Sequence, residues 1–319
     1  MSGAGGLSEF ALIQRFFQPL SKASAFVRCG IGDDCAVLSP AAGEELALSV
    51  DTLVEGVHFP HDYPPSMLAR RALAACVSDL AAAGAEPRAF TLALTLPENG
   101  SDWLAAFSHA LADDAAHYGM SLVGGDTTRG PLCLSFQVMG TVPVGGALLR
   151  SGAKPGDDIY VSGSLGGARA ALDYLDSDSP DARQQACLER YHRPQARVAL
   201  GVALRGIASA AVDISDGLAA DLGHILNASG AGGRLMLGAL PIHPAITDLS
   251  AARDYALSGG DDYELCFTAP AEQRESIAAL SVSLGLPLTC VGGIVPGDGL
   301  SCIDENGQAR SVGAGYQHF

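Results

Sequence analysis

Six short motifs each place an aspartate beside glycine or another small residue, most of them where an apolar run ends. The motifs are Gly32-Asp33-Asp34, Val50-Asp51-Thr52, Ser78-Asp79-Leu80, Gly124-Gly125-Asp126, Asp213-Ile214-Ser215-Asp216-Gly217 and Gly259-Gly260-Asp261-Asp262. A strand that ends in such a motif presents a carboxylate at its exposed end, and glycine lets a ligand approach the backbone closely. Mg²⁺ prefers carboxylate oxygens, together with waters and phosphate oxygens. The motifs therefore predict a binding site for one or more divalent cations.

The charge that these aspartates would bring together also favours a bound cation. Two carboxylates ~4 Å apart repel each other by roughly 4 kcal/mol at an effective dielectric constant of ~20, and a cation removes that cost. The alternative is that each aspartate merely forms a turn or caps a helix. That alternative explains any single motif about as well, but it explains all six together less well.

The composition limits where an anionic ligand can find positive charge. The chain of 319 residues has a formal net charge of −16, and Lys22 and Lys154 are its only lysines. Binding to nucleic acid or to an anionic membrane surface is therefore disfavoured. An anionic substrate has to be neutralised by metal ions, arginines or backbone amides instead.

Length and apolar content predict a folded protein of about two domains, because hydrophobic residues make up 48% of the sequence and charged residues 17%. The sequence has no uninterrupted run of 18 apolar residues, and its N-terminus lacks the pattern of a secretory signal. The eight cysteines form no C-x-x-C pair, which indicates free thiols. Together these features predict a cytoplasmic protein without a membrane span.

Hydrophobic periodicity predicts the elements that position the aspartates. Helices are predicted over 66–84 and 101–118, with Ser101 as the N-cap of the second. A strand is predicted to end at Asp51, and a short strand over 120–123 is predicted to lead into the second glycine–aspartate turn. In both cases the carboxylate is expected at the exposed end of the strand.

A loop-like stretch over 145–156, rich in glycine, predicts a boundary between two domains, residues 1–148 and 149–319. Several strands follow one another without an intervening helix, which favours antiparallel pairing and two α+β domains. The polar segment 177–185 is expected to be a surface loop.

No standard phosphate-binding or hydrolase motif accompanies the aspartates. The sequence lacks G-x-x-x-x-G-K-[ST], G-x-S-x-G and H-E-x-x-H. Gly163-x-x-Gly166-Gly167 is either a phosphate cradle at a helix N-terminus or a tight strand-to-helix turn, of which the turn is favoured. His58, just after the Asp51 motif, is either a structural histidine or a substrate contact.

At these motifs the chain resembles the thiamine-monophosphate kinases. The matching segments occur in the family's order and span about residues 8–319: 30–36, 51–59, 78–85, 124–130, 150–157, 213–218 and 257–265. The resemblance implies ATP-dependent phosphorylation of thiamine monophosphate to thiamine diphosphate, by direct in-line transfer assisted by several Mg²⁺ ions. It also implies the two-domain aminoimidazole ribonucleotide synthetase-like fold, in which the N-terminal sheets of a homodimer form a barrel and the C-terminal domain is α/β.

The resemblance also implies roles for individual positions. It implies metal sites at Asp34, Ser49, Val50, Asp51, Asp79, Asp126, Asp213 and Asp216. It implies nucleotide contacts at Gly125, Asp126, Arg150 and Ser215, and substrate contacts at His58, Asp261 and Tyr316. The residues expected to be catalytic are Asp51, Asp79, Asp126 and Arg150.

Three positions depart from the family's pattern. The residue before Asp51 is often threonine, and Val50 keeps a metal contact only if the ligand is the backbone carbonyl rather than a hydroxyl. Asp261 replaces the usual glutamate, and this shorter acid is expected to reach the substrate directly or through water. His109 stands where some members carry a tyrosine that contacts ATP, so that role is not transferred.

Three other functions remain open at this point. The first is another ATP-dependent enzyme of the same superfamily, but selenophosphate synthetase needs a reactive N-terminal cysteine and none precedes Cys29. A hydrogenase-maturation relative needs a C-terminal cysteine motif, whereas the chain ends Gly315-Tyr316-Gln317-His318-Phe319. The others are a metal-dependent phosphohydrolase, which could use the same carboxylates, and a non-catalytic Mg²⁺- or Ca²⁺-binding protein, for which no EF-hand spacing is present.

Overall fold

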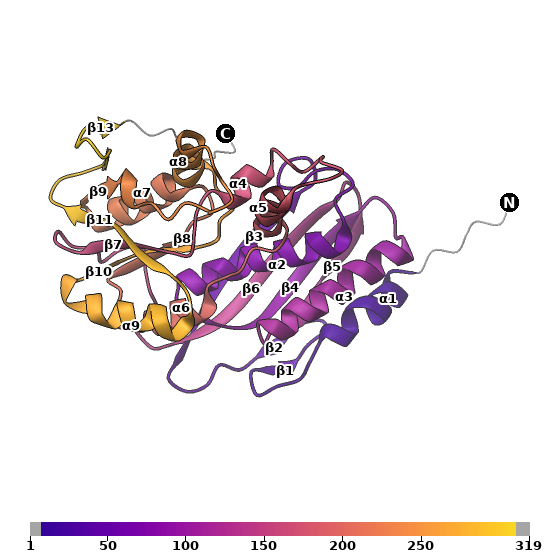
Figure 1. Ribbon diagram of the computed structural model, residues 1–319. Helices are drawn as coiled ribbons and strands as arrows, with labels where there is room; N and C mark the ends of the chain where they lie inside the picture. Colours follow the sequence, from indigo (N-terminus) through magenta and orange to yellow (C-terminus); the bar gives the residue numbers. More distant parts are fainter. Residues whose placement is uncertain (1–7, 311–319) are drawn as a thin grey trace. The chain divides into compact units, whose positions relative to one another are not determined.

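The computed structural model describes residues 8–310, without the side chains of residues 249 and 250. The chain divides into two units, the first comprising residues up to Leu80 together with Glu86–Gly145, and the second Ala81–Ala85 together with Gly146 onward. Each unit combines sheet and helix, so the predicted α+β class is confirmed (Figure 1). In the described part of the chain, no helix has both the length and the apolar character that crossing a membrane requires.

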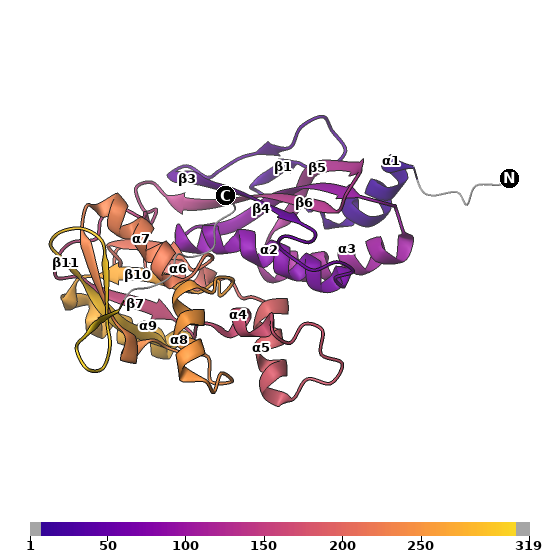
Figure 2. The ribbon, with the colours of Figure 1, turned by 90° about the horizontal axis from the view of Figure 1, so that it is seen from above.

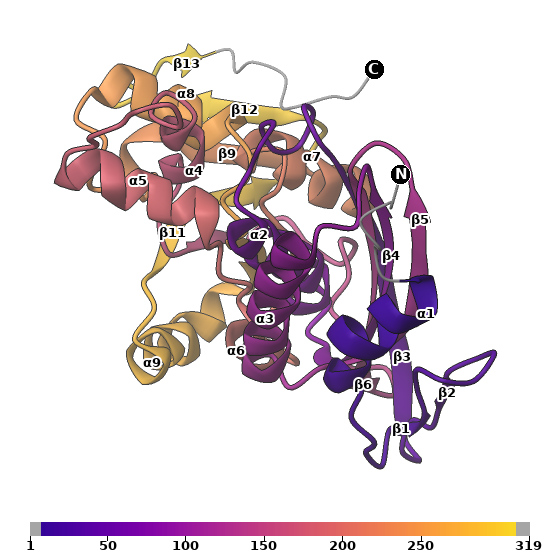
Figure 3. The same cartoon turned by 90° about the vertical axis from the view of Figure 1, so that its right-hand side faces the viewer.

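A four-stranded sheet forms the centre of the first unit. Its strands are β3 (Glu44–Val54), β4 (Glu86–Leu96), β5 (Ser121–Arg129) and β6 (Cys133–Pro143). They lie in the order β3-β6-β4-β5, with β4 and β5 parallel and the other neighbours antiparallel. Two helices, α2 (Pro65–Ala82) and α3 (Ser101–His117), lie on one face of this sheet (Figures 2 and 3).

Apolar spacing explains this packing. In α2, Leu68, Ala72 and Cys76 recur at every fourth position and are fully buried, so that one side of the helix is continuously apolar. In β6, alternate residues such as Phe136 and Val138 are also fully buried, as expected for a strand with one face against helices.

Short elements precede the sheet. They are α1 (Glu9–Leu12), the π-helix η1 (Ile13–Phe17), the 3₁₀-helix η2 (Gln18–Leu20) and the paired strands β1 (Val27–Cys29) and β2 (Val37–Leu38).

Three sequence predictions for this unit are wrong in detail. β3 continues past Asp51 to Val54, and β5 runs through Gly124 and Asp126, because both strands keep pairing with their neighbours. These carboxylates therefore lie within strands rather than at strand ends. The N-cap of α3 is Gly100, and Ser101 is the first helical residue.

A seven-stranded, mostly antiparallel sheet forms the centre of the second unit, in the order β13-β12-β9-β11-β7-β10-β8. Its strands are β7 (Asp158–Ser162), β8 (Ala210–Asp213), β9 (Gly232–Met236), β10 (Leu265–Ala269), β11 (Leu288–Val295), β12 (Leu300–Ile303) and β13 (Ala309–Arg310). Its helices are α4 (Gly167–Ala171), α5 (Ala182–His192), α6 (Val198–Ala203), α7 (Leu218–Ser229), α8 (Leu249–Ser258) and α9 (Arg274–Leu284), with the short 3₁₀-helices η3 (Leu237–Ala239) and η4 (Ala271–Gln273).

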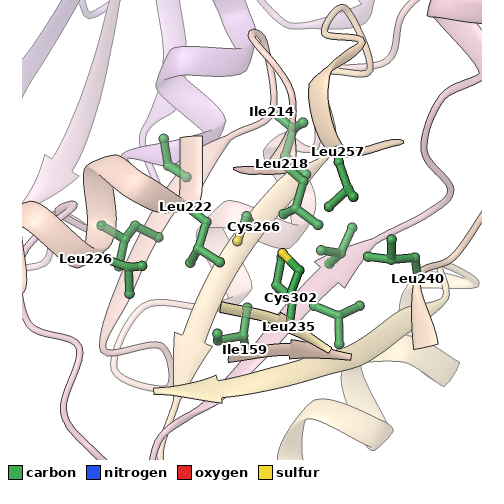
Figure 4. Packing of buried hydrophobic residues seen from close by; sticks show 14 of the residues in the cluster. Ile159, Ile214, Leu218, Leu222, Leu226, Leu235, Leu240, Leu257, Cys266 and Cys302 are labelled. Atoms are coloured by element: carbon green, nitrogen blue, oxygen red, sulfur yellow. The ribbon is translucent and has the colours of Figure 1, made fainter. Parts of the chain in front are cut away.

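The core of this unit is built from side chains of α7 and of the sheet. Leu218 and Leu222 of α7 pack with Ile159 and Leu235 of the strands and with Leu257 of α8 (Figure 4). This packing fixes the two loops that leave the sheet at Asp213 and enter it at Leu265, and both loops carry predicted site residues.

The segment expected to be a loop at 177–185 is partly helical, because α5 begins at Ala182. Asp181 accepts hydrogen bonds from the backbone N–H groups of Arg183 and Gln184, and the Gln184 side chain accepts in return from the Asp181 N–H. This capping box starts a helix in a sequence that looks too polar for one.

Candidate active site

An acidic pair lies where β3 faces α2. Asp51 of β3 and Asp79 of α2 are close enough that the charge of Asp79 raises the pKa of Asp51, which burial raises still more. The hydroxyl of Ser49 donates a hydrogen bond to Oδ2 of Asp79. The position thus gathers two carboxylates and a hydroxyl in a partly buried place, which is the donor chemistry that a hard divalent cation prefers.

Cys76 completes this cluster and was not predicted from the sequence. The thiol is fully buried, and burial raises its pKa well above the usual range, with the charge of Asp51 adding to the effect. The thiol therefore stays protonated and serves as a hydrogen-bond partner of the Asp51 carboxylate. Its spacing of three residues from Asp79 on a helix is the signal that could have found it.

A pocket of about 520 Å³ lies beside β5 in the same unit. Its apolar lining consists of Phe10, Ile13, Phe17, Ile31, Ala36, Leu92, Leu94, Leu122 and Val123. Its polar lining consists of Gly32, Asp33, Asp34, Gly124, Gly125, Asp126 and Thr127. The sequence motifs indicated the polar side, whereas the apolar wall contributed by α1 and η1 was not predicted.

Gly125 lines this pocket with backbone alone. Its φ is 151°, and a Cβ atom there would lie 1.9 Å from the carbonyl oxygen of Leu92. Only glycine fits, so the chain beside the pocket is bare backbone. The neighbouring Asp126 is exposed, as is Asp34 on the facing loop.

Within one copy of the chain, the acidic pair and the pocket stand at opposite edges of the sheet. Asp51, Phe136, Leu92 and Gly125 form one row across its four strands. Neighbouring strands lie about 4.8 Å apart, so the row spans roughly 14 Å. Asp126 is one residue beyond Gly125 and its side chain points to the other face, away from that of Asp51. Accordingly, residues 8–310 contain no cluster of three or more His, Cys, Asp or Glu side chains able to hold a metal ion.

In the second unit, a buried carboxylate organises the loop that follows β8. Oδ2 of Asp221 in α7 accepts hydrogen bonds from the backbone N–H groups of Ser215 and Asp216, both at 3.0 Å. Burial raises the pKa of Asp221 to about 7. Asp213, at the end of β8, is itself buried. The sequence predicted site roles for Asp213, Ser215 and Asp216, but it did not indicate that Asp221 positions their loop.

The loop that carries Asp261 is joined directly to this one. The Asp261 N–H donates to the carbonyl oxygen of Ser215 at 2.8 Å. A Cβ atom on Gly260 would lie 2.6 Å from the same oxygen, so the two backbones touch. A predicted nucleotide contact and a predicted substrate contact thus lie on adjoining loops of one unit.

The glycine turn at residues 163–167 has a structural role. The N–H of Gly166 donates to both carboxylate oxygens of Asp262, at 3.0 and 2.8 Å. A Cβ atom on Gly163 would lie 2.2 Å from the carboxylate of Glu264. The turn therefore accommodates two acidic side chains of the neighbouring loop, which agrees with the favoured interpretation of a tight strand-to-helix turn.

Four further positions were predicted to belong to the site: His58, Val50, Arg150 and Tyr316. His58 is half-buried, and its Nδ1 accepts a hydrogen bond from the Val54 N–H at 3.0 Å. The side chain of Val50 is 63% exposed on the face of β3 opposite Asp51. Arg150, in the second unit, is exposed. Tyr316 lies outside the described residues.

Known protein families match both units of the chain. The N-terminal domain family of the AIR synthase related proteins matches residues 32–142, and the corresponding C-terminal domain family matches residues 154–305. A thiamine-monophosphate kinase from Salmonella typhimurium is 47% identical over 320 residues, which cover 98% of both chains.

Solved structures give the same result. A thiamine-monophosphate kinase from Stenotrophomonas maltophilia has 45% sequence identity and a TM-score of 0.87, covering 96% of this chain and 99% of the other. AaThiL complexed with AMPPCP and TMP has 29% identity and a TM-score of 0.79, with both chains covered completely. From its sequence, both of its domains and its fold, the chain belongs to the thiamine-monophosphate kinase family of the AIR synthase related proteins.

Proposed function

We propose that this chain transfers the γ-phosphoryl group of ATP to thiamine monophosphate, giving thiamine diphosphate and ADP. The observation that carries the proposal is the relationship to thiamine-monophosphate kinases along nearly the whole chain. A structural relative that aligns over its full length binds an ATP analogue together with TMP. The acceptor is a phosphate monoester that is already ionised, so the enzyme needs positioning and charge neutralisation rather than a covalent nucleophile.

The residues of the acidic pair suit Mg²⁺, with Asp51, Asp79 and Ser49 offering oxygen atoms from β3 and α2. When bound, Mg²⁺ would supply positive charge to the phosphate oxygens and so offset the repulsion between the two anionic substrates. Further metal contacts are proposed at Asp34 and Asp126 in the first unit, at Asp213 and Asp216 in the second, and at the backbone carbonyl of Val50. The carbonyl is the remaining choice at Val50 because valine has no hydroxyl.

The pocket beside β5 suits the nucleotide. Its apolar wall matches a purine base, and the glycine-rich backbone at Gly124–Gly125 lets phosphate oxygens come close without a side chain intervening. Gly125, Asp126, Arg150 and Ser215 are proposed to contact ATP, with Arg150 as the protein cation. His58, Asp261 and Tyr316 are proposed to contact thiamine monophosphate.

A homodimer would explain two features of the first unit. Leu46, Leu48 and Val50 are 44, 58 and 63% exposed on one face of β3, which is an apolar stripe that a second copy can cover. Asp51 and Asp126 stand on the two edge strands of the sheet, so a barrel of two sheets, in which β5 of the partner lies beside β3, would bring the two kinds of site together. We therefore propose that the enzyme acts as a homodimer. Its location in the cytoplasm stays a prediction.

Product analysis tests the proposal. The purified protein is incubated with ATP, Mg²⁺ and, in separate reactions, thiamine, thiamine monophosphate and thiamine diphosphate. Equal amounts of ADP and thiamine diphosphate, formed only with thiamine monophosphate, are expected. Release of inorganic phosphate in place of thiamine diphosphate would instead identify a phosphohydrolase. Turnover with none of these acceptors would exclude the proposed substrate.

A further inference from the structure

The loop Gly259–Tyr263, between α8 and β10, adopts an unusual backbone. Asp261 has φ 61° and Tyr263 has φ 50°, and they are two of the three non-glycine residues with positive φ in the described part of the chain. The left-handed region is unfavourable for side chains with a Cβ atom, and most so for bulky ones such as tyrosine. Such strain persists only where surrounding interactions hold it, and it concentrates at functional sites.

Buried charges hold this loop in place. Glu264, with no exposed side-chain surface, forms ion pairs with Arg190 and Arg197 and accepts a hydrogen bond from the Ser162 hydroxyl at 2.6 Å. Arg190 also donates to the carbonyl oxygen of Asp262. On the other side, the N–H of Tyr263 donates to the carbonyl oxygen of Ile214 at 2.8 Å. The loop is therefore anchored at both ends of the strained residues.

Within this frame, Tyr263 fixes the direction of the Asp261 carboxylate. The Tyr263 hydroxyl donates a hydrogen bond to Oδ1 of Asp261 at 3.1 Å. Both side chains are half-buried. A hydrogen bond from a rigid ring to a carboxylate restricts rotation of the carboxylate about its χ angles. Because Asp has one methylene fewer than Glu, this bond and the backbone conformation leave the carboxylate little freedom.

We propose that Tyr263 is a positioning residue, which holds the Asp261 carboxylate in the orientation that binds the cationic or amino-bearing part of thiamine monophosphate. This inference rests on the proposed function. The left-handed backbone of both residues then has a purpose, since it brings a phenol and a carboxylate two positions apart onto the same side of the loop. Tyr263 itself is not proposed to touch the reacting phosphates.

The test is Tyr263→Phe, which removes the hydroxyl and keeps the ring. We expect KM for thiamine monophosphate to rise about 3- to 10-fold, the effect of losing one hydrogen bond to a charged group that stays solvated in part. KM for ATP and kcat should change less than 2-fold. Tyr255→Phe is the matched control, because the Tyr255 hydroxyl also donates to an aspartate, Asp173, at 2.9 Å. That control should leave both KM values unchanged.

A double-mutant cycle shows whether Tyr263 acts through Asp261. Asp261→Gly removes the carboxylate and tolerates φ 61°. In that background Tyr263→Phe should have no further effect on KM for thiamine monophosphate. The proposal fails if Tyr263→Phe behaves like wild type, if it raises KM for ATP equally, or if its penalty persists without Asp261. A wild-type enzyme that does not phosphorylate thiamine monophosphate would refute the proposed function rather than this role.

Discussion

Replacing Glu264 by Gln should destabilise the second unit more than any single surface change. Glu264 is fully buried, whereas the side chains of its partners Arg190 and Arg197 are 17 and 15% exposed. The substitution keeps the volume but removes the negative charge, and it turns an N–H₂ group toward guanidinium donors. Two arginines are then left near each other without a counter-charge in a place that water reaches poorly.

The expected magnitude follows from burial. Breaking a buried ion pair by removing one partner costs about 3 to 5 kcal/mol. Because both arginines keep some contact with water, the lower end of about 3 kcal/mol applies here. A unit of this size loses roughly 2 to 4 °C in melting temperature for each kcal/mol, so Tm should fall by about 6 to 12 °C.

Thermal unfolding followed by circular dichroism measures this effect, with Glu305→Gln as the matched control. Glu305 also pairs with an arginine, Arg253, but the two side chains are 49 and 36% exposed. An exposed pair contributes about 0 to 1 kcal/mol, so the control should lower Tm by less than about 4 °C. If Glu264→Gln melts within 2 °C of the control, the buried ion cluster does not stabilise the loop.

Three further predictions follow from the site, the sheet face and the buried acids. Asp79→Asn should abolish ADP formation in a coupled assay with little change in Tm, and EDTA should abolish ADP formation by the wild type. Full activity in either case would contradict the metal role. Leu48→Glu should convert the homodimer to monomers, as measured by light scattering at micromolar concentration. The control Val282→Glu, at an apolar position that is 84% exposed, should not. A monomeric wild type would exclude the homodimer. Burial raises the pKa of Asp262 to about 7, so its native state holds a proton that the unfolded state has lost, and this contribution to stability disappears as pH rises from about 4 through 7. The free energy of unfolding of Asp262→Asn in urea, taken relative to that of wild type, should therefore rise by about 2 to 3 kcal/mol between pH 5 and pH 7.5. If this difference does not change with pH, Asp262 is ionised throughout.

Local patterns predicted the elements well and the arrangement of the site poorly. The apolar periodicity of α2 and the alternation of β6 depend on near neighbours in the sequence, so they could be read directly. The row that places Asp51 and Asp126 at opposite edges depends on strand order, which no local pattern contains. The sequence indicated both residues as candidates and suggested that they belong to a single cluster. Within one copy of the chain, however, they lie at two separate positions.

The residues that support the site were harder to find than those proposed to bind ligands. Glu264 meets partners from 67 to 102 positions away in the sequence, namely Arg197, Arg190 and Ser162. In the sequence, Asp221 is one more polar residue of a predicted helix, whereas in the structure its carboxylate accepts hydrogen bonds from two backbone N–H groups. Supporting roles of this kind arise from tertiary contacts, whereas the glycine–aspartate motifs show themselves within a few residues.

The alternation along β3 has an evolutionary consequence. Ser49 and Asp51 point toward α2, while Leu48 and Val50 point to the opposite, exposed face. A one-residue insertion or deletion within the strand would exchange the two sets, because side chains alternate with a period of two. Such a one-residue shift in the strand would move the hydroxyl and the carboxylate to the outer face and the apolar residues to the face against the helix. Homologous genes can therefore vary β3 by substitution, but we expect its length between Glu44 and Val54 to be nearly invariant, with length variation confined to the loops at its ends.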